Sequence, residues 1–259
     1  MRKSVVIDCL PQSAHRYRAH WAVVAVDVIR ATTTAITAAA DGWQCYIAPD
    51  VPAACTMAGK LENPCMAGES GGLIPYDFEM NNSPAALALR NDKHRPLVLV
   101  SSSGTRLIHL AAGCDNVYLG CFRNYSALVN HLAEHHSQVA VIGAGSKDEF
   151  REEDQICCAW IAAGLMSRGY TPKNQITVEI VQRWQNAPPN ACLVSHSVDF
   201  LMRTGQLNDL DFILSHVDDL DSVFEVRDGL VNMTSSAARP TAHVDGRSRA
   251  FPAATALEA

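Results

Sequence analysis

Short runs of apolar residues recur along the chain, and each is followed by a polar turn and then by a helical pattern. The clearest runs cover residues 23–26, 96–100 and 139–142. Strands that are apolar on both faces and alternate with helices are typical of a largely parallel sheet covered by helices on both sides. We therefore predict an α/β fold with three layers, α/β/α, in which the repeated strand, turn and helix units suggest two similar lobes.

The same patterns place the other elements. We expect further strands at residues 4–8, 45–48, 116–120 and 221–232, the last with a turn at Asp228 and Gly229. Helices are expected at 35–40, from 50, at 83–90, 107–112, 124–136 and 152–168, and in a more helical last third at 176–185 and 192–204. Residues 65–82 lack periodicity and are expected to form a long functional loop.

One domain is predicted for residues 1–233. Residues 234–259 are rich in Thr, Ser, Ala, Pro and Arg and show no apolar period. A segment of this kind buries too little apolar surface to fold, so we expect a flexible C-terminal tail.

The turn after the run at 23–26 combines groups that suit catalysis. Residues 27–34 present Asp27, Arg30 and three threonines immediately before an alanine-rich helix. The start of a helix has unpaired backbone N–H groups that bind anions such as phosphate, and open α/β sheets bind ligands at the carboxyl ends of their strands. The alternative interpretation is an ordinary strand-to-helix turn whose threonines only cap the helix.

Two further turns at strand ends, residues 101–105 and 143–154, are rich in hydroxyl or charged groups. If the three strands are neighbours, their turns converge on one cleft that contains several carboxylates and the guanidinium of Arg30. The carboxylates are those of Asp27, Glu69, Glu79 and Asp154. Because clustered carboxylates raise each other's pKa, we expect Mg²⁺ between them, and the metal and Arg30 together would hold a phosphate.

Other features carry weaker signals. Glu152 and Glu153 are equally well explained as solvated charges at the start of a helix, and Asn124 as a helix cap. Gly143 and Gly145 resemble the start of a dinucleotide-binding fingerprint, but Asp148 stands at the third glycine position and would oppose a pyrophosphate.

Composition narrows the class of protein. The net charge is −6 without a basic block, so a nucleic-acid-binding surface is not expected. No apolar run is long enough to span a membrane, and the nine cysteines contain no C-x-x-C pair. We therefore expect a cytoplasmic protein with reduced, mostly buried thiols, and an apolar content that allows a homodimer.

Taken together, the motifs resemble the 2-phosphosulfolactate phosphatase family from the first strand to about Met233. The strongest block is the stretch from Val26 to Thr34. The others are Gly68-Glu69 with Asn82-Ser83-Pro84, then Ser102-Ser103-Gly104-Thr105, the single residue Asn124, and Gly145 with Glu153-Asp154. The resemblance implies an α/β/α architecture and Mg²⁺-dependent removal of phosphate from a three-carbon sulfonate, a step towards coenzyme M.

The chain departs from the family pattern at four positions. Ser70, Glu79, Asn81 and Ser103 stand where the family usually has Arg, Asp, Gly and Asn. Loss of an arginine removes a bidentate partner for an anion. We therefore expect a phosphatase for a small anionic phosphomonoester similar to 2-phosphosulfolactate, and the alternative is a diverged relative that binds a phosphate or another anion without turnover.

The roles follow from the turns and from the resemblance. The expected catalytic residues are Asp27, Arg30, Glu69 and Asp154, and the expected metal ligands are Asp27, Glu69, Glu79 and Asp154. The expected substrate-binding residues are Thr32, Thr33, Asn82, Ser102, Ser103, Gly104, Thr105 and Asn124. The attacking group is either an aspartate or a metal-bound water.

Overall fold

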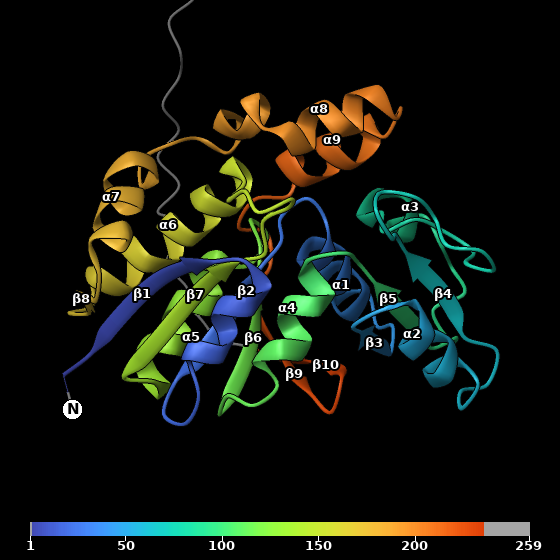
Figure 1. Cartoon of the computed structure of the whole chain (residues 1–259), viewed down its shortest axis with the longest axis horizontal. Helices are drawn as coiled ribbons and strands as arrows, with labels where there is room; N and C mark the ends of the chain where they lie inside the picture. Colours follow the sequence, from blue (N-terminus) through green and yellow to red (C-terminus); the bar gives the residue numbers. More distant parts are fainter. Residues whose placement is uncertain (1, 236–259) are drawn as a thin grey trace, which may run out of the picture.

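The computed structural model describes residues 2–235, which form one ten-stranded mixed sheet and the helices that cover it (Figure 1). In sheet order, the strands are β4 (Cys65–Gly68), β5 (Leu97–Val100), β3 (Cys45–Ala48), β10 (Leu230–Ser235), β9 (Ser222–Arg227), β6 (Asn116–Gly120), β2 (Ala22–Val26), β7 (Gln138–Gly143), β1 (Ser4–Cys9) and β8 (Thr171–Pro172). The predicted α/β class with a largely parallel sheet is confirmed.

Two groups of parallel strands share this sheet. The smaller group consists of β4, β5 and β3, and the larger of β6, β2, β7, β1 and β8. The antiparallel hairpin β9–β10 joins them, with β10 beside β3 and β9 beside β6. Of the three strand, turn and helix units that the sequence repeats, the larger group contains two, β2 and β7 with the helices that follow them, and the smaller group contains β5 with its helix.

Nine α-helices and two 3-10 helices lie within residues 2–235. The α-helices are α1 (Ala31–Ala40), α2 (Val51–Ala58), α3 (Pro84–Ala88), α4 (Gly104–Ala111), α5 (Tyr125–His135), α6 (Glu152–Met166), α7 (Gln175–Trp184), α8 (His196–Arg203) and α9 (Leu207–Ser215). The 3-10 helices are η1 (Pro11–Arg16) and η2 (Pro189–Val194).

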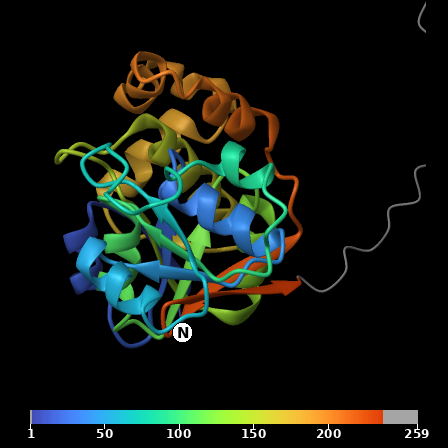
Figure 2. The ribbon, with the colours of Figure 1, turned by 90° about the vertical axis from the view of Figure 1, so that its right-hand side faces the viewer.

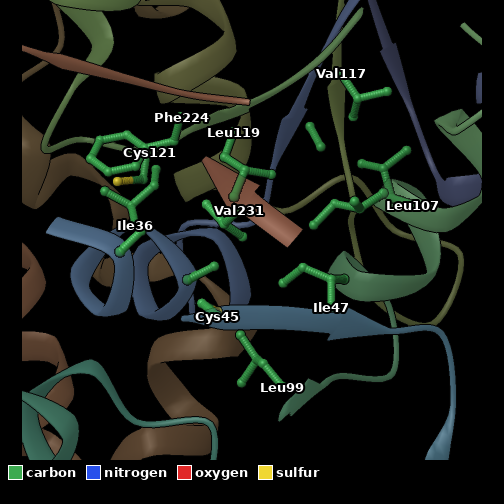
Figure 3. Close-up of a cluster of buried hydrophobic side chains, with 14 of the residues drawn as sticks. Ile36, Cys45, Ile47, Leu99, Leu107, Val117, Leu119, Cys121, Phe224 and Val231 are labelled. Carbon is green, nitrogen blue, oxygen red and sulfur yellow. The ribbon is translucent and has the colours of Figure 1, made fainter. Parts of the chain in front are cut away.

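Helices α1 and α4 lie between the two strand groups. α1 contacts β6 of the larger group and β3 and β5 of the smaller, and α4 contacts β2 and β3. Nearly all of α1 is buried, and its small alanine and threonine side chains let strands approach from both sides. The shared core is drawn in Figure 3, with Leu119 of the larger group and Leu99 of the smaller on either side of Ile36.

The other faces of the two groups have their own helices. α5, α6 and α7 form a second core with β1, β2 and β7, which includes Val24 and Val141. α2 packs on β3 and β5, and the N-cap of α2 is Asp50, whose side chain accepts a hydrogen bond from Ala53 N. α8 and α9 gather at one end of the molecule (Figure 2), where their small core includes Ile29, just after β2.

Several sequence expectations need correction. The stretch 65–82 begins with strand β4, which was missed because four small apolar residues give no alternation. The helical last third contains α9, which was not predicted, and the final strand is a hairpin of two. Strand β10 extends to Ser235, and residues 236–259 of the predicted tail lie outside the described residues.

The cysteines agree with the sequence expectation. All nine are free thiols, and six of them are buried. Within residues 2–235, no helix has the length and apolar character that crossing a membrane requires.

Candidate functional site

The site is organised by the neighbouring strands β2 and β7, which are parallel and in register from Ala22 opposite Val139 to Val26 opposite Gly143. α1, which follows β2, packs on one face of the sheet, whereas α6, which follows β7, packs on the other. The carboxyl ends of two strands whose connections diverge in this way form the place where open α/β sheets bind ligands. Asp27 lies directly after β2, at this point.

The turn at residues 101–105 lies near Asp27, but not because its strand is next to β2. Its strand, β5, is not a neighbour of β2 or β7, so convergence through adjacent strands is wrong for residues 101–105. Instead α4 begins at Gly104 against Asp27. A Cβ atom on Gly104 would lie 2.3 Å from Oδ2 of Asp27 and 2.6 Å from Cβ of Ala31. The starts of α1 and α4 therefore meet at the Asp27 carboxylate.

Asp27 is buried in this junction. Ala31 N donates to its Oδ1 at 3.2 Å. Burial raises the pKa of Asp27 to about 7, and the nearby carboxylates of Glu69 and Glu153 act in the same direction, whereas the Ala31 N–H and the Arg30 guanidinium oppose the shift. A carboxyl group with a pKa near neutrality is a common feature of functional sites.

Two more buried acids, Glu153 and Asp154, lie at the start of α6. Val28 N donates to Oδ1 of Asp154 at 2.9 Å, and Gly145 N donates to Oδ2 at 3.1 Å. Asp154 thereby ties the turn after β2 to the turn after β7. Burial, followed by the charges of Asp27 and Glu153, raises the pKa of Asp154 well above its usual range.

Glu153 is the acid whose importance was underestimated from sequence. Its side chain is 1% exposed, and its Oε2 has no hydrogen-bond partner within residues 2–235. Burial raises its pKa, whereas the nearby side chains of Ser197 and Ser195 oppose the shift. A solvated position at a helix start, one of the two interpretations left open, is therefore wrong for Glu153. A buried carboxylate oxygen without a donor is costly unless a ligand, proton or cation completes it.

Glu69 joins the loop after β4 to the turn after β5. Ser102 donates to it from its backbone N at 2.6 Å and from its Oγ at 2.9 Å, and Gly72 N donates at 2.8 Å. Ser102 and Glu69 are thus brought together as expected, although Ser102 contacts the carboxylate and is not free for a phosphate.

Arg30 is buried and already paired. Its Nη1 donates to Oδ2 of Asp209 at 2.5 Å and to Oε1 of Gln206 at 2.6 Å. Its Nη2 donates to Oδ1 of Asn81 at 3.4 Å. The expected free cation is therefore an arginine held by the start of α9, a partner that is 179 residues away in sequence.

The threonine hydroxyls stabilise the backbone of the turn. Thr32 Oγ1 donates to the carbonyls of Asp27 and Gly120 and accepts from Asp27 N, and Thr33 Oγ1 donates to the carbonyl of Val28. Thr105 forms the equivalent bonds with Ser101. All three side chains are buried. Their expected role in holding phosphate is not supported, because these hydroxyls are engaged with the main chain.

Asn124 has the same kind of structural role. Its Oδ1 accepts from Cys121 N and its Nδ2 donates to the carbonyl of Leu119. It stands at the N-cap position of α5 but makes no side-chain capping bond.

The remaining expected site residues are divided between the junction and its surroundings. Ser103 precedes Gly104 at the start of α4, and its side chain makes no capping bond. Asn82 is buried, with no partner for Oδ1 in the described part of the chain, and follows Asn81, whose Oδ1 accepts from Asn82 N. Oδ1 of Asn82 is therefore, like Oε2 of Glu153, a buried oxygen that a hydrogen bond from a ligand could satisfy.

Glu79 does not belong to the carboxylate cluster. Its carboxylate forms ion pairs with Arg90 and Arg95, and these arginines lower its pKa. This pairing does not favour the expected role of Glu79 as a metal ligand, which stays a prediction. Among residues 2–235, no three His, Cys, Asp or Glu side chains gather as they would around a bound metal ion.

A groove runs between α3 and α9, next to the Arg30 network. It has a volume of about 990 Å³ and an open mouth. Asn81, Ser83, Gln206 and Asp209 form part of its polar wall, and Leu89 and Phe212 contribute apolar surface. The groove therefore reaches the residues that hold Arg30.

The chain is similar to known proteins over most of its length. The sequence profile of the family described as 2-phosphosulpholactate phosphatase matches residues 8–229, which include every site residue described above. A probable 2-phosphosulfolactate phosphatase of Pseudothermotoga lettingae is 34% identical over 142 residues, 55% of this chain and 61% of the relative. Probable 2-phosphosulfolactate phosphatases of Symbiobacterium thermophilum and Caldicellulosiruptor saccharolyticus are 29% and 26% identical, over 73% and 80% of this chain and 84% and 90% of their own lengths.

Proposed function

The chain belongs to the 2-phosphosulpholactate phosphatase family, and from that premise we propose that it is a phosphomonoester hydrolase. Its proposed substrate is a small anionic phosphomonoester similar to 2-phosphosulfolactate, and its proposed cofactor is Mg²⁺. The observation that carries the proposal is the buried Asp27 carboxylate, held where the starts of α1 and α4 meet, whose pKa the charge of Glu153 raises and that of Arg30 lowers.

The acids of this junction fit a hard divalent cation. Asp27, Glu153 and Asp154 are buried together, and burial and mutual repulsion disfavour their ionised forms. Mg²⁺ is usually bound by one or two carboxylates together with water and substrate phosphate, so a complete protein cage is not required. Asp27 and the unpartnered oxygen of Glu153 are the proposed ligands. When bound, the ion would polarise the phosphate and neutralise charge that develops in the reaction.

The protein groups would position the substrate. The guanidinium of Arg30 lies close enough to Asp27 to lower the pKa of that carboxyl group. The start of α4 at Gly104 adds backbone N–H groups, which favour an anion. Asp154 keeps the turns after β2 and β7 together through its two backbone hydrogen bonds. Catalysis by such a site depends on positioning and on charge stabilisation.

A substrate panel with a matched pair of variants tests the proposal. Phosphate release should be measured with 2-phosphosulfolactate and with carboxylated phosphoesters of similar size. Asp27→Asn should lower kcat/KM at least ~100-fold, the scale of a single key electrostatic group. Asp41→Asn is the control, because Asp41 stands at the other end of the same helix. No turnover of any small phosphoester, or equal losses in both variants, would contradict the proposal.

The rival function is anion binding without turnover. The observation that favours it is the pairing of Arg30 with Asp209, which uses part of the binding capacity of the guanidinium. A ligand that binds only the folded state raises the melting temperature whether or not it reacts. Thermal stabilisation by 2-phosphosulfolactate without release of phosphate would support the rival, and turnover would exclude it.

A further inference from the structure

Arg30, three residues after Asp27, has unused hydrogen-bonding capacity. A guanidinium has five N–H donors. Nη1 uses both of its hydrogens, on Asp209 and Gln206, and Nη2 uses one, on Asn81. Within residues 2–235 the Nε hydrogen and the second Nη2 hydrogen have no hydrogen-bond acceptor. Two donors on one planar group can bind an oxyanion as a fork.

Asp209 is fixed from its other side. Its Oδ1 accepts from Ser83 Oγ at 2.6 Å and from Ala85 N at 3.2 Å, at the start of α3. Its Oδ2 is the acceptor for Arg30. The side chains of Asp209 and Arg30 are both 4% exposed. The carboxylate therefore has three donors and little freedom to move. Because it binds Arg30, it fixes the guanidinium relative to α3 and α9.

Gln206 also helps to hold the guanidinium of Arg30 in place. Its Oε1 accepts from Arg30 Nη1 at 2.6 Å and from Asn81 Nδ2 at 2.7 Å. Asn81 in turn accepts from Arg30 Nη2. The guanidinium is thus held by two residues of the α9 region and one residue of the loop before α3.

The α8–α9 pair is anchored on both sides of this network. Ile29 packs into the small core formed by Val198, Leu201 and Leu210. On α8, Phe200 contacts Gly72, where a Cβ atom would lie 2.9 Å from the ring. The segment therefore contacts the turn that carries Asp27 and the loop that carries Glu69, which suits a part of the molecule that sets the geometry of a site.

Charge explains why this arrangement needs a carboxylate. A buried guanidinium without a counter-ion is strongly disfavoured. Asp27 also attracts Arg30. If Asp209 did not neutralise Arg30, the guanidinium would be drawn towards Asp27, and both groups would be lost to a ligand. Asp209 thus keeps Arg30 and Asp27 apart.

We propose that Asp209 is a positioning residue that holds Arg30 so that its two remaining N–H donors bind an oxyanion of the ligand beside Asp27. The proposal rests on the proposed function for the identity of that ligand. Asp209 itself touches no substrate, and its effect is on the binding of the anion. The alternative is that Asp209 competes with the ligand for Arg30, in which case its removal would strengthen binding.

The test separates the charge of Asp209 from its structural contacts. Asp209→Asn keeps an oxygen for Ser83 but removes the charge facing Arg30. Adding Gln206→Glu returns a carboxylate to Nη1 of Arg30 from the neighbouring residue. Asp211→Asn is the matched control, since Asp211 lies on the same helix and its carboxylate makes no hydrogen bond within residues 2–235. Binding of inorganic phosphate by calorimetry and KM and kcat for 2-phosphosulfolactate are measured for each protein.

We expect Asp209→Asn to weaken phosphate binding and raise KM by ~10-fold or more, the effect of about 1.4 kcal/mol, with a smaller change in kcat. The double variant should recover to within ~3-fold of the wild type, and Asp211→Asn should bind and react as the wild type does, since rim charges contribute little. Unchanged or tighter phosphate binding in Asp209→Asn, or no recovery in a folded double variant, would overturn the proposal.

Two further outcomes keep the proposals distinguishable. If Asp209→Asn does not fold, Ser83→Ala replaces it, because loss of the Ser83 hydroxyl loosens Oδ1 of Asp209 and should weaken phosphate binding in a folded protein. Equal binding in Ser83→Ala and the wild type would then count against the proposal. A wild type that binds phosphate but releases none from any phosphoester refutes the proposed function alone, whereas a wild type that binds no phosphate overturns the role of Asp209.

Discussion

Gly104 allows the carboxylate of Asp27 and the start of α4 to lie against each other, and Gly104→Ala perturbs this contact without a change in charge. An added Cβ would lie 2.3 Å from Oδ2 of Asp27 and 2.9 Å from its Cβ. Ordinary van der Waals contact begins at 3.4 Å, so the neighbours must separate by about 1 Å. The start of α1 is nearly as close to the added atom, since the new Cβ would lie 2.6 Å from the Cβ of Ala31.

Two consequences follow from a shift of that size. Overpacking of a filled core typically lowers the free energy of unfolding by about 1–3 kcal/mol. A misplacement of about 1 Å in a catalytic group can cost ~100-fold in rate. Because the hydrogen bond from Ala31 N to Asp27 is already 3.2 Å long, the carboxylate cannot move away without weakening it. We therefore expect Gly104→Ala to fold with reduced stability and to lose ~100-fold in kcat/KM.

The assay compares kcat/KM for 2-phosphosulfolactate and urea denaturation midpoints of Gly104→Ala and Gly59→Ala. Gly59 ends helix α2, and an added Cβ there would have its nearest neighbour at 3.6 Å, an ordinary contact. The control should keep the activity and stability of the wild type. If Gly104→Ala folds and stays within ~3-fold of wild-type kcat/KM, then the contact between α4 and Asp27 is not part of the site and the reasoning fails.

Two other predictions concern Asp27 and the turn that it begins. Burial raises the pKa of Asp27 to about 7, so the folded metal-free protein keeps a proton that the unfolded chain releases above about pH 4. This difference makes the free energy of unfolding fall by up to about 1.4 kcal/mol per pH unit as the pH rises towards 7. The free energy of unfolding should be measured by urea denaturation at several pH values in EDTA, and in Asp27→Asn its dependence on pH should be smaller by the contribution of one proton. An unchanged dependence on pH would show that Asp27 does not take up the proton. Thr32→Val should lower the free energy of unfolding by about 1–3 kcal/mol, because it leaves Asp27 N unpaired. A raised KM without loss of stability in Thr32→Val would instead restore the phosphate-binding role.

The strand, turn and helix around Asp27 could be predicted from sequence because the signal is local. Residues 23–26 are apolar on both faces, so β2 and Asp27 lie where expected, whereas α1 begins at Ala31, four residues before its expected start, and includes the three threonines. The same local reasoning found β5 and α4. It could not find how they meet, because β5 belongs to the other strand group and reaches Asp27 only through Gly104.

Partners far apart in sequence were the main gap. Asp209 lies on α9, a helix that was not predicted, and no local pattern connects it with Arg30. Glu79 was misassigned for the same reason, since its pairing with Arg95 depends on how the loop after β4 folds back. At the start of α6, sequence gives equal weight to solvent and to a site for Glu153, whereas it predicts Asp154 as a site residue. The packing of α6 decides that both are buried.

We propose that the buried carboxylates around Asp27 act with a divalent cation to remove phosphate from a small anionic phosphomonoester. The most direct measurement is the initial rate of phosphate release from 2-phosphosulfolactate by the wild type as Mg²⁺ is titrated into protein that was first treated with EDTA. We expect no rate above background in EDTA and a saturable increase with Mg²⁺. A rate in EDTA equal to that at saturating Mg²⁺, or no release at any Mg²⁺ concentration, would contradict it.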